Sequence, residues 1–274
     1  MKLVLLDLDS TLIDADYCLN VPENEFRAVV QELADKDVLI GLCSDSASIT
    51  LQQWSHRLGL TGPIVGERGA VIWNSKLQIE DILDIPETAW FCDLREDFIC
   101  AVMRNFPDAT ILIGDATRFV KERSMSHALT RQVFAVNGFR VASFSFFACR
   151  PKKDRSALEP DSKLLERASA LVERIAMTYG KVKERLYWDE NSQYGILIVH
   201  SSTTEKSRAV SALIDQLKPE QTFMVGDGMS DFLNLPHVAQ YAVNNADPRY
   251  KAKSVFVAES PLTKGVIECL RCCV

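Results

Sequence analysis

Two carboxylates separated by one residue follow the first apolar run of the chain. Residues 3–6 are all Leu or Val, and Asp7 and Asp9 come directly after them, followed by Ser10 and Thr11. In a parallel sheet the carboxyl ends of the strands face the ligand crevice, so this pattern presents one carboxylate directly and the second from the next loop. Such a pair can act as a nucleophile with its own acid/base. A simple turn built from Asp, Ser and Thr is the alternative.

A second pair of carboxylates follows another apolar strand late in the chain. Gly226 leads into Asp227 and Asp231, which are four residues apart. We expect Asp227 to leave the strand and Asp231 to lie on the first turn of a helix at 231–235, with both side chains directed into one crevice. Together with Asp7 they would form an oxygen-rich cluster suited to Mg²⁺, a hard cation that prefers carboxylate and water ligands. Gly-Asp-Gly is also a common turn signal.

Groups that could bind an anion lie at two other strand and helix ends. Ser44 follows the second expected strand, and further hydroxyl residues open the next helix, where free backbone N–H groups can hold an anion. Ser46 or Ser48 could instead serve only as a helix cap. Lys206 begins the helix before the second acidic pair, and its ammonium could offset the crowded carboxylates and keep Asp7 ionised. A lysine on a helix is more often solvated.

The elements that must position these residues alternate between strands and helices. This alternation predicts a parallel sheet covered by helices. It occurs in an early and a late stretch of the chain, which we expect to form the two halves of one sheet. The expected order is strand 2–6, helix 23–34, strand 38–42, helix 48–58 and strand 63–65, then helix 205–217, strand 222–225, helix 231–235, strand 241–243 and helix 263–270.

The segment between the two halves, from about residue 74 to 199, has a different pattern. Alternating apolar runs at 140–147 and 194–199 indicate half-exposed strands. A polar loop at 150–160 leads into an amphipathic helix at 163–179. We therefore expect a second, α+β domain inserted into the parallel sheet.

Composition and charge exclude several classes of protein. The 274 residues are 47 % hydrophobic and 25 % charged, which is ordinary for a globular protein with a large core. The formal net charge of -6 gives no basic footprint, so nucleic acid is not expected as a partner. The sequence has no signal-peptide pattern and no segment of membrane-spanning length, so we expect a cytoplasmic protein with reduced cysteines and no membrane partner.

Taken in order, the motifs resemble those of the haloacid dehalogenase (HAD) superfamily. They are Asp7-x-Asp9-x-Thr11, Ser44, Lys206 and Gly226-Asp227-x-x-x-Asp231. The long insertion resembles that of the type IIB, Cof-like branch, which includes sugar-phosphate phosphatases, mannosyl-3-phosphoglycerate phosphatase-like proteins and phosphomannomutase. The resemblance implies an α/β fold with a doubly wound, Rossmann-like parallel-sheet core at 1–74 and 200–274. An α+β cap domain that sets substrate specificity is implied at 75–199.

The resemblance also implies roles for individual residues. Asp7 is implied as the nucleophile that forms an aspartyl-phosphate, and Asp9 as the acid that protonates the leaving oxygen and then activates water. Ser44 and Lys206 are implied to bind the phosphoryl oxygens. Mg²⁺ is implied on Asp7, the Asp9 backbone carbonyl and Asp227, with Asp231 a ligand directly or through water. Further substrate contacts are expected from Thr11, Asp45 and Arg68.

Three positions depart from the pattern of that branch. Its usual Ser-Gly-Arg reads Ser44-Asp45-Ser46, so an arginine near the substrate is missing. The usual Asn before the last acid is Ser230, and the Asn of a Glu-Asn-Gly-Ala segment is Arg68. We hypothesise that Arg68 supplies the guanidinium that position 46 lacks, with a solvated arginine as the alternative.

The predicted function is hydrolysis of phosphoric monoesters by an Mg²⁺-dependent phosphatase. Its substrate is expected to be a small phosphorylated metabolite, either a sugar phosphate or a phosphorylated organic acid. One alternative is a phosphomutase that uses the same nucleophile and requires a bisphosphate activator. Another is a non-catalytic sensor of a phosphorylated ligand, which any metal-dependent turnover would exclude.

Overall fold

The computed structural model describes residues 1–74, 79–82, 88–121, 131–154, 157–179 and 185–273. The chain divides into two compact units. The first, here called the core unit, comprises Met1–Leu83 and Thr204–Val274, and the second, the insertion, comprises Asp84–Thr203. The boundary expected after residue 74 falls between two strands that both belong to the sheet of the core unit.

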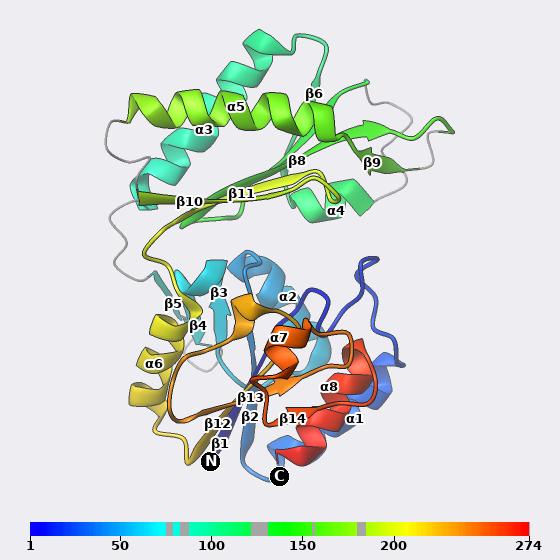
Figure 1. The fold of residues 1–274 in the computed structure, drawn as a ribbon, viewed down its shortest axis with the longest axis vertical. Helices are drawn as coiled ribbons and strands as arrows, with labels where there is room; N and C mark the ends of the chain where they lie inside the picture. The colour runs from blue at the N-terminus through cyan, green and yellow to red at the C-terminus, as the bar shows by residue number, and fades with distance from the viewer. Residues whose placement is uncertain (75–78, 83–87, 122–130, 155–156, 180–184, 274) are drawn as a thin grey trace. The chain divides into compact units, whose positions relative to one another are not determined.

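The core unit is built on an eight-stranded sheet in the order β14-β13-β12-β1-β2-β3-β4-β5 (Figure 1). Pairing is parallel from β14 to β3 and antiparallel between β3, β4 and β5. Thus β1 lies in the interior of the sheet, between β12 and β2. The strands are β1 Lys2–Leu6, β2 Val38–Cys43, β3 Ile64–Gly66, β4 Val71–Asn74, β5 Ile79–Ile82, β12 Gln221–Gly226, β13 Val238–Ala242 and β14 Phe256–Val257.

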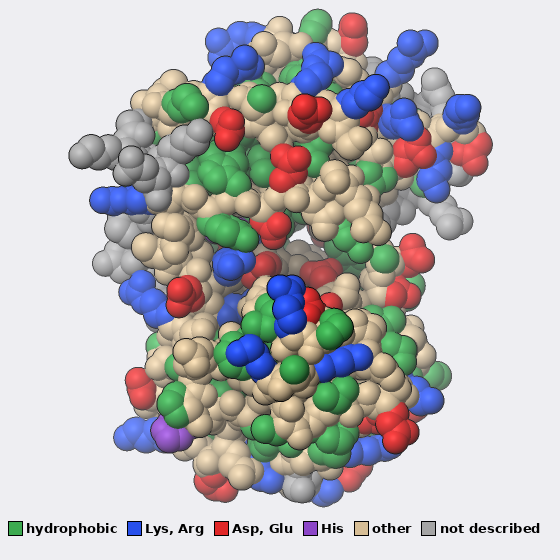
Figure 2. Space-filling model, in the orientation of Figure 1, with side chains coloured by type: hydrophobic (Ala, Val, Ile, Leu, Met, Phe, Trp, Pro, Cys, Tyr) green, Lys and Arg blue, Asp and Glu red, His purple; other side chains and the backbone are tan. Residues whose placement is uncertain are grey.

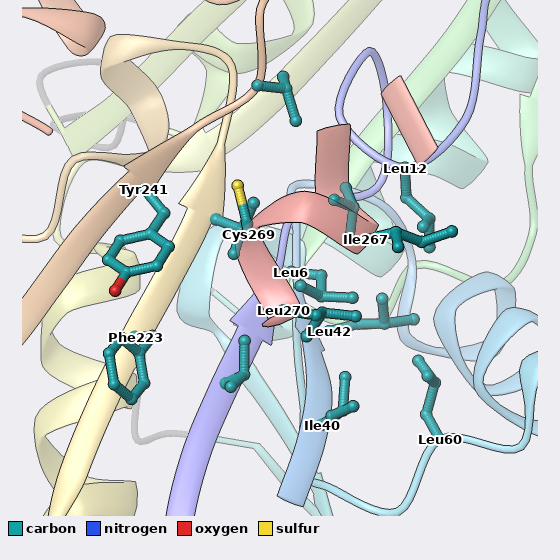
Figure 3. Packing of buried hydrophobic residues seen from close by; sticks show 14 of the residues in the cluster. Leu6, Leu12, Ile40, Leu42, Leu60, Phe223, Tyr241, Ile267, Cys269 and Leu270 are labelled. Carbon is teal, nitrogen blue, oxygen red and sulfur yellow. The ribbon is translucent and has the colours of Figure 1, made fainter. Parts of the chain in front are cut away.

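Helices cover both faces of this sheet, which explains why residues 3–6 of β1 are all apolar rather than alternating. Val4 and Leu6 belong to a cluster with residues of α1, α2 and α8, whereas Leu3 and Leu5 pack with residues of α6 on the other face. Figure 3 shows Leu6 beside residues of β2 and α8 in the first cluster. The helices are α1 Glu23–Ala34, α2 Ser48–Leu58, α6 Lys206–Leu217, α7 Pro248–Lys251 and α8 Leu262–Cys272.

One predicted element of the core unit is wrong. The helix expected at 231–235 is not formed, because the chain makes only a single 3₁₀ turn, Met229–Asp231, before it continues irregularly to β13. Two causes are local. The Asp231 carboxylate accepts hydrogen bonds from backbone N–H groups that precede it in the chain. Pro236 also disfavours the helical conformation in the residue before it.

The insertion has its own mixed sheet, in the order β10-β11-β8-β7-β6, with β9 paired to β8. Only β6 and β7 pair in parallel among its described strands. The helices α3 and α5 pack on one face, where Phe98 of α3 stacks on Phe146 of β8 with ring centroids 4.5 Å apart. The elements are α3 Thr88–Asn105, β6 Thr110–Gly114, α4 Ala116–Lys121, β7 Val133–Asn137, β8 Ser143–Pro151, β9 Leu158–Pro160, α5 Ser162–Thr178, β10 Leu186–Asn191 and β11 Ile196–Ser201.

The polar loop expected at 150–160 is partly a strand pair. Arg150 and Pro151 extend β8 and pair with Glu159 and Leu158 of β9. Arg150 Nε also lies 2.9 Å from Glu159 Oε1. A short, polar edge strand of this kind lacks the apolar alternation on which strand prediction depends.

Side chains of both signs lie interspersed on the face of the molecule shown in Figure 2. This mixture agrees with the modest net charge of -6. Within the described ranges, every helix is too short or too polar to cross a membrane.

Candidate active site

Three of the predicted site residues follow adjacent strands of the core sheet. Asp7 comes directly after β1, Ser44 after β2 and Asp227 after β12. Because these strands are parallel neighbours, their carboxyl ends meet at one edge of the sheet. The Asp7 backbone N–H still donates to Val225 O at 2.9 Å. The predicted nucleophile is therefore fixed by the end of the strand ladder rather than by a free loop.

Lys206, the first residue of α6, is buried and contacts two of the acids. Its Nζ atom lies 2.7 Å from Asp231 Oδ1 and 3.3 Å from Asp7 Oδ1. The Lys206 side chain is only 4 % exposed, so the alternative of a solvated helix lysine is wrong. Burial by itself lowers the pKa of Lys206, but the attraction of Asp231 and Asp7 outweighs it and raises the pKa well above its usual value. Lys206 thus remains a cation at neutral pH.

The Asp7 carboxylate is electrostatically crowded. Burial raises the pKa of Asp7 well above its usual value, and the Asp231 carboxylate raises it further, while Lys206 opposes both. One ammonium is thus shared between two buried carboxylates, those of Asp7 and Asp231. A second cation at this point would favour the ionised, nucleophilic form of Asp7.

Asp231 connects Lys206 to the loop that carries Asp227. Asp231 Oδ1 accepts from Lys206, and Oδ2 accepts from the backbone N–H groups of Asp227 at 3.1 Å and Gly228 at 3.0 Å. Both carboxylate oxygens therefore have donors within the protein. The Asp227 side chain is held from another direction, because Thr11 Oγ1 donates to Asp227 Oδ1 at 3.1 Å.

The close approach of Asp231 to β12 requires glycine at position 226. A Cβ atom on Gly226 would lie 2.5 Å from Asp231 Cβ and 2.6 Å from Asp231 Oδ2. We expect Gly226→Ala to displace Asp231 and to lower the free energy of unfolding by about 1–3 kcal/mol, as overpacking does. Denaturant unfolding measures this loss. Gly228→Ala is the matched control, since its Cβ would lie 3.3 Å from the nearest atom, Ser230 Oγ. An equal loss in both variants would contradict the steric argument.

The acidic cluster fits a hard divalent cation. Asp7, Asp227 and Asp231 each offer a carboxylate oxygen, and these atoms lie within 4.8 Å of one another. Burial, followed by the charge of Asp231, raises the pKa of Asp227 to about 6. Carboxylates that are this crowded and partly desolvated are the all-oxygen donor set that Mg²⁺ prefers.

Asp9 is held by a contact that the sequence does not indicate. Asp9 Oδ2 accepts a hydrogen bond from Ser46 Oγ at 2.9 Å. The following turn is also fixed, since the Ser10 N–H donates to Ile13 O at 2.9 Å and the Asn245 side chain donates to Ser10 O at 2.6 Å. Ser46 and Asn245 were not predicted as site residues. The sequence marks Ser46 only as a possible helix cap and as the residue that stands where the branch usually has an arginine.

Of the remaining predicted substrate contacts, Asp45 lies close to Lys206. Ser44 is buried, and its Oγ accepts from the Ser46 N–H at 3.3 Å. Asp45 Oδ1 lies 3.8 Å from Lys206 Nζ, and Asp45 Oδ2 lies 3.7 Å from Arg68 Nη1. The structure thus brings Arg68 beside the Ser44-Asp45-Ser46 segment, as an ion-pair partner of Asp45.

The helix-cap alternative for Ser46 does not hold. Helix α2 begins at Ser48, and its N-cap is Ala47, with no side-chain hydrogen bond to the cap. The Ser46 hydroxyl is instead directed to Asp9.

A buried carboxylate follows the first strand of the core sheet, and further acids follow the neighbouring strand β12. This arrangement agrees with a comparison of the chain with known families. Residues 4–270 match the family model of the haloacid dehalogenase-like hydrolases, and the chain belongs to this family. The predicted family, fold class and hydrolase class are confirmed.

Several known proteins are similar to this chain. The phosphoglycolate phosphatase of Thermoplasma volcanium is 27 % identical over 93 residues, which are 34 % of this chain and 40 % of that protein. A haloacid dehalogenase-like hydrolase from Bacteroides thetaiotaomicron shares the fold with a TM-score of 0.68 at 16 % identity, over 100 % of this chain and 99 % of that one. A trehalose-6-phosphate phosphatase related protein has a TM-score of 0.59 at 13 % identity, over 98 % and 95 % of the two chains.

Proposed function

We propose that this hydrolase is an Mg²⁺-dependent phosphatase that acts on a small phosphorylated metabolite, either a sugar phosphate or a phosphorylated organic acid. The observation that carries the proposal is Asp7 at the end of β1 with the Lys206 ammonium 3.3 Å from its carboxylate. Phosphoryl transfer depends chiefly on positioning and charge neutralisation, and this pair supplies both. The names of two similar proteins, a phosphoglycolate phosphatase and a trehalose-6-phosphate phosphatase related protein, support phosphate esters as substrates.

The proposed reaction has two steps. Asp7 attacks phosphorus, and the bond to the leaving oxygen breaks with its electron pair on that oxygen, which takes a proton from Asp9. A water molecule then attacks the aspartyl-phosphate, and Asp9, now a carboxylate, takes a proton from this water. The Asp7–phosphorus bond breaks, which restores the carboxylate and gives inorganic phosphate. Ser44 and Lys206 bind the phosphoryl oxygens in both steps.

Asp7, Asp227 and the Asp9 backbone carbonyl would hold Mg²⁺, and Asp231 would complete the acidic cluster directly or through water. When bound, the ion would neutralise negative charge on the nucleophile and on the phosphoryl group. Both carboxylate oxygens of Asp231 already accept hydrogen bonds, so the main contribution of Asp231 is to fix the Asp227 loop and Lys206.

Mg²⁺ affinity is expected to weaken as the pH falls through 6. The pKa of Asp227 in the metal-free protein is raised to about 6 by burial and by Asp231, so protons compete with the metal below that pH. The stability of the metal-free protein depends on pH in the opposite direction. A folded-state pKa above the ordinary value favours the protonated form, so the metal-free protein loses stability as the pH rises from about 4 through 6. The increase in Tm caused by Mg²⁺ should therefore be larger at pH 7.5 than at pH 5.5.

Calorimetric titration of Mg²⁺ at the two pH values measures this dependence directly. Asp227→Asn is the control, because it removes the titrating group and should give weak binding at both. Equal affinity of the wild-type protein at both pH values would contradict the assignment of Asp227.

We further propose that Arg68, Asp45 and Thr11 help to bind the substrate. Arg68 Nη1 lies 3.7 Å from Asp45 Oδ2, so its guanidinium is near the segment in which the branch usually carries an arginine. Thr11 acts by holding Asp227. Selection among substrates is assigned to the insertion, the segment predicted as a cap at 75–199.

Phosphate release from a panel of phosphorylated sugars and organic acids tests the proposal. The assay compares Mg²⁺ with a chelator, and repeats the best substrates with and without a bisphosphate sugar. Metal-dependent release without the bisphosphate supports a phosphatase. Activity that requires the bisphosphate would replace it with a phosphomutase, and no metal-dependent turnover of any compound would favour a sensor.

A further inference from the structure

The Ser46 hydroxyl joins the acid/base carboxylate to a second strand end. Ser46 follows β2, whereas Asp9 lies in the loop after β1, and the two side chains meet with Oγ 2.9 Å from Oδ2.

Two hydrogen bonds hold the backbone of Ser46 and so position its hydroxyl group. The Ser46 N–H donates to Ser44 Oγ at 3.3 Å, and the Ser46 carbonyl accepts from the Glu67 N–H at 3.0 Å. Both peptide groups of Ser46 are thereby held, and a serine side chain has only one heavy-atom rotation to lose. The hydroxyl can therefore fix Asp9 at little entropic cost.

We propose that Ser46 is a positioning residue that holds Asp9 Oδ2, so that the proton exchanged in the reaction is carried on Asp9 Oδ1. The inference rests on the proposed phosphatase function. In the first step, the Oδ1 proton passes to the leaving oxygen as the phosphorus–oxygen bond breaks and the Asp7–phosphorus bond forms. The alcohol departs with the electron pair and the proton, and Asp9 remains as a carboxylate with Ser46 still donating to Oδ2.

A positioning role predicts a dependence on the leaving group. An alkyl phosphate, such as a sugar phosphate, must receive a proton as it leaves, because an alkoxide is a poor leaving group. p-Nitrophenyl phosphate leaves as a stable anion and needs no proton. A misplaced Asp9 should therefore slow the alkyl ester selectively, whereas general damage to the fold or to phosphate binding should slow both esters alike.

The experiment measures kcat/KM for the best alkyl phosphate and for p-nitrophenyl phosphate. General acid catalysis contributes about 10²–10⁴-fold to the rate, so Asp9→Asn should lower kcat/KM for the alkyl ester by that factor. Ser46→Ala should lower kcat/KM for the same ester by about tenfold. Both variants should lose much less on the aryl ester. Ser46→Thr keeps the hydroxyl and should restore most of the alkyl activity. Ser55→Ala in α2 is the matched control and should leave both esters unchanged.

The outcomes separate this inference from the proposed function. Equal losses on the two esters in Ser46→Ala, or no loss on either, would overturn the role of Ser46. Ser46→Cys, with a similar size and a weaker donor, provides the same comparison should the alanine variant not fold. If the wild-type protein releases phosphate from neither ester, or if Asp7→Asn keeps the activity, the phosphatase itself is wrong.

Discussion

Replacing Asp7 with asparagine is expected to lower kcat for phosphate release by at least about 10⁴-fold while the protein stays folded. The amide has almost the same volume as the carboxylate but cannot form and release the phosphorylated intermediate. The substitution also removes one member of a cluster in which burial and Asp231 raise the pKa of Asp7. The metal-free variant should therefore be at least as stable as the wild-type protein.

Phosphate release and thermal unfolding, measured side by side, test both parts of this expectation. A loss of activity with an unchanged or higher Tm identifies Asp7 as the nucleophile. Activity within tenfold of the wild type would show that another group attacks phosphorus. A large drop in Tm would mean that the Asp7 carboxylate stabilises the fold through Lys206 more than its burial costs.

Replacing Lys206 with alanine should damage both stability and activity. The change leaves Asp7 and Asp231 buried without the ammonium that lies 3.3 and 2.7 Å from their carboxylates. Breaking a buried charge pair in this way costs about 3–5 kcal/mol. Loss of a charge that stabilises the transferring phosphoryl group lowers kcat/KM by about 10²–10³-fold. Mg²⁺ should recover part of the Tm, because it supplies positive charge to the same carboxylates.

The control for this variant is Arg208→Ala, in the first turn of the same helix. Arg208 is exposed, so its removal should change the free energy of unfolding by no more than about 0.5 kcal/mol. A Lys206→Ala protein as stable as Arg208→Ala would show that the acids become protonated rather than remain unpaired.

The placement of residues at strand ends is the part of the site that the sequence predicts well. Asp7, Ser44 and Asp227 each follow an apolar run, and a parallel sheet forces the ends of neighbouring strands together whatever the intervening sequence. Such placement requires only strand positions and chain order. The bounds of α1 and α2 were likewise predicted from helical periodicity, because both are amphipathic and covered on one face.

Contacts between side chains are the part that sequence reasoning misses. Ser46 and Asp9 are 37 residues apart, and nothing in their spacing reveals that the two side chains meet. Asp231 was expected on the first turn of a helix because it follows Asp227 by four residues. Its carboxylate instead accepts hydrogen bonds from the backbone N–H groups of Asp227 and Gly228, which competes with the formation of a helix at this point. These outcomes depend on tertiary neighbours that local pattern does not encode.

The interior position of β1 bears on how the protein is made on the ribosome. Strand β1 pairs with β2 on one side, but its other partner, β12, begins at Gln221 and is synthesised long afterward. Until then one edge of a strand with four consecutive apolar residues, 3–6, is open to pairing with other chains. A chain released before residue 221 should therefore aggregate, and the insertion, whose sheet is complete without β1, should mature first.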